Sequence, residues 1–364
     1  MTGQPVLKDP MSTTTNKRKW KYGFKRWIVL GLLILAGWLA FVAPQTFGPF
    51  KPVIPTVVLP GEELWPGAQI VPPFDLGSFH FGGIPLTNTI LSTLLADLLL
   101  VAIALFVVRP NVRSGAAQPS RLYVGVEMLV EYFWNQVVTG VGAKWARRVF
   151  PIVVTIFLLI LSANLVKMMP GYEVFGWLKP VEGEGGVKAY PVVPVAGNVY
   201  ALNGAPSAQS EGPKYELVPF LRGSATDINF PLALAVFTVT CIFVFGVWSQ
   251  KGAFFGKYFP FGRMISVPMF GVIDFIVGIL EFFLEFVKVI SLTLRLFGNI
   301  FAGGLLLLII GSLTAVIVPA GLAAFELFVG AIQAYVFAML ALIFIQLAMA
   351  GHGGEQPHAD GEHH

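Results

Sequence analysis

The sequence predicts an all-α integral membrane protein with about six transmembrane helices, of which the last two are long, tilted and hairpin-like, plus one interfacial amphipathic helix. Of its 364 residues, 55% are hydrophobic and 12% are charged, whereas soluble domains carry about 25% charged residues. Several apolar runs reach the ~20 residues that a helix needs to cross ~30 Å of hydrocarbon. These runs lack the polar–apolar alternation of a membrane β-strand, so we expect the spans to be helices.

The N-terminal part of the chain falls into three predicted segments. Residues 1–26 form a basic cytoplasmic N-terminus, residues 27–43 an extra anchor helix, and residues 44–87 an outer segment rich in Pro and Gly. A basic stretch before an apolar run is also typical of a signal peptide. We favour a retained helix because the run contains Trp27 and Trp38 and shows no clear small-residue cleavage site.

The next part of the sequence predicts two spans with a surface helix between them. The second span covers residues 86–108 and is expected to end at Arg109 and Pro110. Residues 122–138 repeat apolar side chains at helical spacing and place acidic side chains on another side, which indicates an interfacial helix on the cytoplasmic surface. The third span is expected over residues 150–169.

The rest of the chain completes a predicted membrane domain of residues 88–351. Its long outer loop is rich in Gly and Pro, and loops of this length are usually functional or partly disordered. The elements expected here are the loop at 170–229, a fourth span at 230–248, two long apolar segments at 264–311 and 313–350, and a polar tail at 352–364.

Basic residues orient the spans. The N-terminus and the segments 109–148 and 249–263 hold 7, 6 and 3 of the 24 Lys and Arg residues, and alternate spans place all three on one side. The positive-inside rule makes that side the cytoplasm, so both termini are expected there. Because these residues flank apolar runs and form no patch with interleaved aromatics, we expect membrane lipid and no nucleic acid as a partner.

Patterns of enzymes and metal sites are missing from the sequence. The lone Cys241 offers neither a disulfide nor a thiolate cluster. The tail histidines are expected to be solvated; they are His352, His358, His363 and His364. We therefore expect no cofactor, no metal and no catalytic chemistry in this chain by itself.

One helical face of the segment 264–311 is polar along its whole length. Counting at about 100° per residue places six polar side chains in a common arc. They are Asp274, Glu281, Glu285, Lys288, Arg295 and Asn299, and Ser291 lies in the same segment. A charge at the bilayer centre costs ~2.5–3.5 kcal/mol on insertion scales, so such residues face water, a partner or an ion path.

Arg295 is the most informative member of this polar face. Glu285 and Lys288 are explained equally well by a salt-bridge ladder that joins helices, whereas Arg295 has no acidic residue within about one turn on its own helix. Arginine keeps its charge even when it is buried. We therefore expect its counter-charge to come from elsewhere, in the form of a mobile carboxylate.

The last span provides the opposing face. Glu326 and Gln333 stand seven residues apart, with Gly330 between them, so that they share one side of a helix. If the last two spans form a hairpin, this side faces Arg295, and the Gln333 amide can orient the guanidinium without neutralising it.

Three further polar residues predict a watery entrance from the outer side. Asn164 lies within the third span, and Asp227 and Asn229 precede the fourth. For Asn164, an interhelical hydrogen bond worth ~0.6 kcal/mol is an equally good interpretation.

The run Ser291-Leu-Thr-Leu-Arg-Leu-Phe-Gly-Asn-Ile-Phe-Ala-Gly303 resembles the signature of subunit a of F-type ATP synthases. The similarity extends through Leu86-Thr-Asn-Thr, through residues 151–170 around Asn164, and through Asp227-Ile-Asn229 to Glu326 and Gln333. Only the first 60 or so residues and part of the outer loop lie outside it.

The resemblance implies a stator subunit whose last two helices lie against a rotating ring of c subunits. Arg295 then matches the arginine that attracts each passing c-subunit carboxylate and blocks short-circuiting between two half-channels, with Asn299 and Gln333 as its neighbours. The remaining matches are Glu281 and Ser291 in the cytoplasmic half-channel and Asn164, Asp227 and Asn229 near the outer one.

In one place the sequence departs from the family pattern. Many bacterial relatives carry Glu nine residues after the arginine and His on the last helix, whereas this chain has Gly304 and Glu326 at those positions. We therefore assign the outer relay to Glu326.

The resemblance also sets the expected partners and location. They are the c ring, the b subunits of the peripheral stalk, the rest of the ATP synthase, and the bacterial inner membrane. The alternatives are a secondary transporter with an anionic substrate site at Arg295, or a membrane scaffold; the first lacks the internal repeat and paired broken helices of transporters. We expect the ion to be the proton, while the sequence leaves Na⁺ open.

Overall fold

A computed structural model describes fourteen stretches of the chain, and the account below concerns these alone. They are residues 61–64, 69–71, 74–76, 79–81, 83–114, 119–169, 172–173, 175–180, 192–196, 199–202, 215–251, 253–258, 268–313 and 317–350. The expected N-terminal segment 1–26, the anchor helix 27–43 and the tail 352–364 lie outside them.

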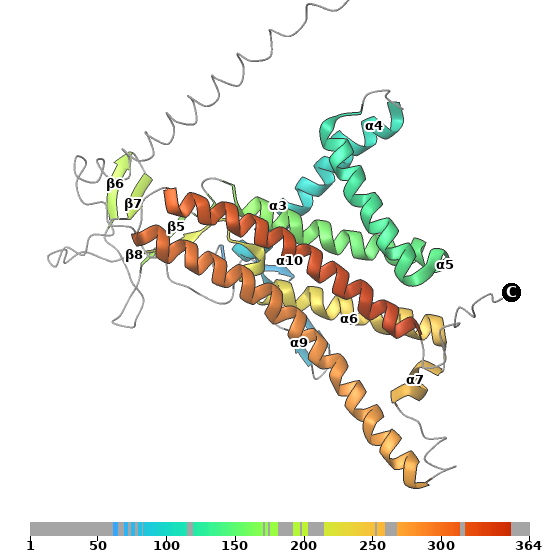
Figure 1. Cartoon of the computed structure of the whole chain (residues 1–364). Coiled ribbons are helices and arrows are strands. Elements are labelled where there is room, and N and C mark those ends of the chain that lie inside the picture. The colour runs from blue at the N-terminus through green and yellow to red at the C-terminus, as the bar shows by residue number, and fades with distance from the viewer. Residues whose placement is uncertain are drawn as a thin grey trace, which may run out of the picture.

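Long helices make up most of the described chain (Figure 1). The α-helices are α3 (Asn88–Ala102), α4 (Arg109–Ser114), α5 (Arg121–Lys167), α6 (Asn229–Gln250), α7 (Ala253–Tyr258), α9 (Pro268–Leu313) and α10 (Ile317–Ala350). A π-helix, η1 (Ile103–Val108), joins α3 to α4, and a 3₁₀ turn, η2 (Ser224–Thr226), precedes α6.

Short antiparallel strand pairs lie in the outer segments that were expected to be loops. Strand β1 (Gln69–Val71) pairs with β4 (Ile84–Pro85), and β2 (Phe74–Leu76) pairs with β3 (Phe79–Phe81). In the long loop, β5 (Gly176–Pro180) pairs with β8 (Tyr215–Pro219), and β6 (Val192–Ala196) pairs with β7 (Val199–Leu202). The outer segment and the expected loop therefore contain short strands, although helices dominate the fold.

Four helical stretches of the described residues are long and apolar enough to cross a membrane: Asn88–Arg113, Arg121–Lys167, Asn229–Gln250 and Val318–Ala350. Their length and composition are those of an all-α membrane protein. The strands β5 to β8 gather at one end of the helices, which we call the loop end, and α7 lies at the other, which we call the α7 end (Figure 1).

One predicted boundary was wrong. The second span does not stop at Val108, because η1 continues into α4 and the chain stays helical through Arg109 and Pro110. The interfacial helix and the third span carry one label, α5, but they are two helices that meet at a kink at Gly142, where φ is +77°. The basic residues before the third span belong to the helix: Arg148 lies over the rings of Trp145 and Trp248 at 5.4 and 4.3 Å.

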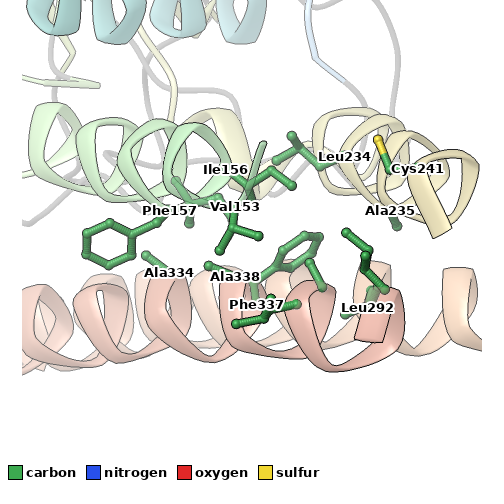
Figure 2. Packing of buried hydrophobic residues seen from close by; sticks show 14 of the residues in the cluster. Val153, Ile156, Phe157, Leu234, Ala235, Cys241, Leu292, Ala334, Phe337 and Ala338 are labelled. Atoms are coloured by element: carbon green, nitrogen blue, oxygen red, sulfur yellow. The ribbon is translucent and has the colours of Figure 1, made fainter. Parts of the chain in front are cut away.

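The apolar core lies between α5, α6, α9 and α10 (Figure 2). Val153 and Phe157 of α5 approach Ala334 and Phe337 of α10, and small residues on α10 let the helix backbones come close together. From α9, Leu292 packs into the same cluster. This packing fixes which face of α9 points inward and which points outward.

Helices α9 and α10 run antiparallel to each other. Lys288 of α9 lies 5.0 Å from the ring of Phe344, Asn299 binds Gln333, and the Cβ position of Gly303 lies 3.4 Å from the Glu326 side chain. Contacting positions rise in number along α9 and fall along α10, so the two helices pack side by side as antiparallel neighbours.

Candidate functional site

The residues of the predicted polar face share one helix, because α9 runs without interruption from Pro268 to Leu313, but Glu285 is buried whereas Arg295 is exposed. Leu292, Leu296 and Ile300 are almost fully buried in the core. Ser291, Arg295 and Asn299 are exposed on the other side. The helix thus turns its apolar side to the protein and presents Arg295 outward.

Arg295 stands at this surface without a partner in the described part of the chain. It makes no hydrogen bond and no ion pair there. The neighbouring side chains Ile290 and Leu294 are 57% and 53% exposed. A guanidinium held among exposed apolar side chains is costly in lipid, so this face is suited to a partner that carries negative charge.

The interaction across the hairpin links Asn299 and Gln333. The side-chain amide of Asn299 donates to Oε1 of Gln333 at 2.9 Å. Gln333 is 3% exposed, and its Nε2 has no hydrogen-bond partner among the described residues. The prediction that Gln333 opposes this face is confirmed, but its carbonyl oxygen contacts Asn299 and no contact with the guanidinium is present.

Glu326 forms an ion pair that the sequence did not predict. Its Oε1 accepts from Nζ of Lys167, the last residue of α5, at 2.6 Å, and the two side chains are 8% and 10% exposed. Nothing in the described chain binds the buried Oε2 of Glu326. The pair joins α5 to α10 at the loop end, next to Gly303 and Gly304 of α9.

A second lysine–carboxylate pair lies on α9 toward the α7 end. Lys288 donates to Oε1 of Glu285 at 2.7 Å, and the hydroxyl of Tyr258 on α7 donates to the same oxygen at 3.2 Å. Burial, and then the adjacent Glu285, raise the pKa of Tyr258 above its usual value. The expected salt bridge between Glu285 and Lys288 is present, but it lies within α9 and joins no helices; the contact to another helix comes from Tyr258. Glu281 lies half-buried one turn earlier.

Asn164 forms the interhelical hydrogen bond that was one of its two interpretations. Its Nδ2 donates to the backbone carbonyl of Gly330 at 3.1 Å. A Cβ at position 330 would lie only 3.1 Å from the Asn164 side chain. Asn164 therefore holds α5 against α10 one turn away from Glu326.

Asp227 lies in a buried polar cluster at the loop end. Its Oδ2 accepts from Thr89 at 2.8 Å and from the Gly61 backbone at 3.2 Å, and its Oδ1 accepts from the Asn229 backbone at 3.0 Å. Asp227 is 4% exposed, whereas Asn229 is exposed. These contacts give Asp227 a part in joining α3 to α6, and they do not bring it to Glu326.

Lys167 and Tyr258 are the site residues that sequence reasoning missed. Lys167 is the one charged residue of the predicted third span, and an ionisable residue within a span calls for a search for its partner. That signal was present in the sequence. The sequence offered no such signal for Tyr258, because its contact with Glu285 depends on how α7 packs against α9.

Comparison with known proteins decides the family. A family model described as the ATP synthase A chain matches residues 90–346, well over half of the chain. The chain belongs to this family. Its members are subunit a of the membrane sector of the rotary ATP synthase, so this subunit a is a membrane protein associated with the rest of that complex.

Relatives of this subunit a come from several bacteria. Subunit a of Mycobacterium bovis is 34% identical over 266 residues, which cover 72% of this chain and 87% of the relative. Subunit a of Mycobacterium leprae is 30% identical over 297 residues, with 79% and 96% covered. A subunit a of Propionigenium modestum, named as sodium ion specific, is 27% identical over 268 residues, with 72% and 74% covered.

Proposed function

We propose that this subunit a conducts protons between the aqueous phases and the carboxylates of a c ring through two half-channels, and that Arg295 couples this flow to rotation. The observation that carries the proposal is the position of Arg295 on α9: it is exposed, has no partner in the described chain, and lies between two lysine–carboxylate pairs whose glutamates are buried.

The spacing along α9 supports two separate paths. Arg295 comes ten residues after Glu285 and eight before Gly303, which contacts Glu326. At a rise of 1.5 Å per residue these intervals correspond to roughly 15 Å and roughly 12 Å along the helix. A fixed cation between two acidic positions repels a proton or metal cation that would pass directly from one to the other.

Buried polar atoms without hydrogen-bond partners also support two separate paths. Nearly all buried polar groups in proteins are hydrogen-bonded, to protein or to ordered water. Among the described residues, unpartnered atoms of this kind include Oε2 of Glu326 and Nε2 of Gln333 toward the loop end and Oε2 of Glu285 toward the α7 end. We assign water to both places, as each half-channel requires.

In the proposed cycle, the c-ring carboxylate releases its proton into one half-channel and moves past Arg295 in its ionised form. The guanidinium attracts this carboxylate, and the exposed Asn299 and Ser291 provide polar contacts on the same face. Glu326 delivers protons on the loop side. Glu281 and Ser291 belong to the cytoplasmic path, and Asn164, Asp227 and Asn229 border the outer one.

The proposal includes the topology. We place the α7 end in the cytoplasm, because Lys251 and Lys257 lie there, and we place the long loop outside. Counting the anchor helix 27–43, the chain then crosses the bacterial inner membrane six times. Helices α9 and α10 lie tilted along the c ring, and the b subunits bind elsewhere on the chain.

Replacement of Arg295 tests the proposal most directly. Arg295→Ala is expected to abolish ATP-driven acidification of inverted membrane vesicles that contain the whole complex, because the passing carboxylate loses its counter-charge. Leu294→Ala is the matched control: it truncates an exposed neighbour of 53% exposure without changing charge. Normal pumping by Arg295→Ala, with the subunit present in the complex, would contradict the proposal.

A further inference from the structure

Lys167 reaches its carboxylate from an enclosed position. Its aliphatic stem runs beside Gly223, where a Cβ would lie 3.0 Å from the lysine Cδ and 3.3 Å from Cε. Gly223 belongs to the segment between β8 and α6, and its N–H donates to the side chain of Glu173 at 2.9 Å. The lysine is thus held along its length, and its ammonium group has little freedom to leave Glu326.

Glycine on α9 makes room for this ammonium group. A Cβ at position 304 would lie 3.0 Å from Nζ of Lys167 and 3.9 Å from Oε1 of Glu326. A Cβ at position 303 would lie 3.4 Å from the same carboxylate oxygen. Any longer side chain at position 304 would compete with the Lys167 ammonium group for this space. The ion pair therefore depends on three helices: α5 carries Lys167, α10 carries Glu326, and α9 leaves room for both.

The two oxygens of Glu326 therefore have different tasks. Oε1 binds the ammonium group, while Oε2 is buried and has no hydrogen-bond partner within the described chain. A metal cation bound to this carboxylate would lie close to a fixed positive charge and be repelled by it. A proton overcomes this repulsion, because it forms a covalent bond with Oε2, the oxygen that Lys167 does not bind.

We propose that Lys167 is a positioning residue that holds Oε1 of Glu326, presents Oε2 as the proton-accepting atom, and denies the carboxylate to Na⁺. This rests on the proposed function of Glu326 as a relay. A proton arriving through water forms an O–H bond at Oε2 and leaves a water molecule behind. That bond breaks when the c-ring carboxylate takes the proton, and Lys167 keeps its own protons throughout.

The test compares variants of the whole complex in vesicles, with proton conduction measured at fixed pH and ionic strength. Lys167→Met is expected to slow conduction about tenfold or more, since misplacement of a reacting group by about 1 Å can cost as much as 100-fold. Lys167→Arg, which keeps the charge, recovers most of the rate. Replacing choline by Na⁺ slows Lys167→Met further and leaves the wild type unchanged.

Two comparisons separate this inference from the proposed function and from misfolding. The neutral pair Lys167→Met with Glu326→Gln leaves no buried charge; it is expected to assemble normally and to conduct as slowly as Glu326→Gln alone. If Glu326→Gln conducts at the wild-type rate, the relay itself is wrong. If Glu326→Gln is slow but Lys167→Met is not, or if Na⁺ slows the wild type equally, only the role of Lys167 is overturned.

Discussion

The two lysine–carboxylate pairs of this subunit resemble each other in chemistry and differ in construction. In each, a lysine binds one oxygen of a buried glutamate, and the other oxygen has no hydrogen-bond partner within the described residues. Lys288 and Glu285 stand three residues apart on one helix, whereas Lys167 and Glu326 are 159 residues apart on two. The first pair is a property of α9 alone, and the second holds two helices together.

The lysine side chains of the two pairs also differ in their exposure to solvent. The side chain of Lys288 is 25% exposed, while that of Lys167 is 10% exposed. A lysine near water can turn its head group outward when its partner is lost. An enclosed lysine has no such outlet, so the same substitution is expected to have larger consequences at the loop end.

The largest expected contrast concerns conduction. Glu326→Gln should slow ATP-driven proton transport about 100-fold, the lower range for loss of a positioned acid–base group. Glu285→Gln should have a much smaller effect, since the amide oxygen keeps an acceptor for Lys288 and Tyr258 and Glu281 lies one turn away. Rates of vesicle acidification measure both. Equal slowing by the two substitutions would remove the distinction between the relay and the local pair.

The next contrast concerns stability. Glu326→Leu leaves Lys167 enclosed without its counter-charge, which costs about 3–5 kcal/mol for a buried pair. Glu285→Leu leaves Lys288 able to reach water and is expected to cost about 1 kcal/mol, as for exposed pairs. The midpoint of thermal denaturation of the purified complex shows which of the two substitutions destabilises it more. A double variant, Lys167→Met with Glu326→Leu, should recover most of the loss, and its failure to do so would argue against charge burial as the cause.

The smallest expected effect is that of Tyr258→Phe. This substitution removes one hydrogen bond to Glu285 and leaves the Lys288 contact in place, a change of about 1 kcal/mol. Proton transport should stay within about fivefold of the wild type, because about 1 kcal/mol alters an equilibrium by roughly that factor. Complete loss of transport would show that the hydroxyl belongs to the proton path.

Local periodicity explains why much of the candidate site was predictable. The helical repeat placed Asp274, Glu281, Glu285, Lys288 and Arg295 on one face before any packing was known, and α9 is one unbroken helix. The seven-residue spacing placed Glu326 and Gln333 on one face of the last helix, and the condition that the last two helices pack together made that face oppose α9. The boundaries of α5 were harder, because basic residues that indicate a loop pack against Trp145 and Trp248.

By itself, the sequence determined that the chain is a membrane-spanning helical protein with an isolated arginine on a polar stripe, because composition and local spacing decide helix length and helix face. Tertiary structure alone decided which carboxylate each lysine binds. The Lys167–Glu326 pair exists because α5 packs against α10 and because position 304 of α9 carries no side chain. A contact across 159 residues depends on that packing, and no local pattern in the sequence encodes it.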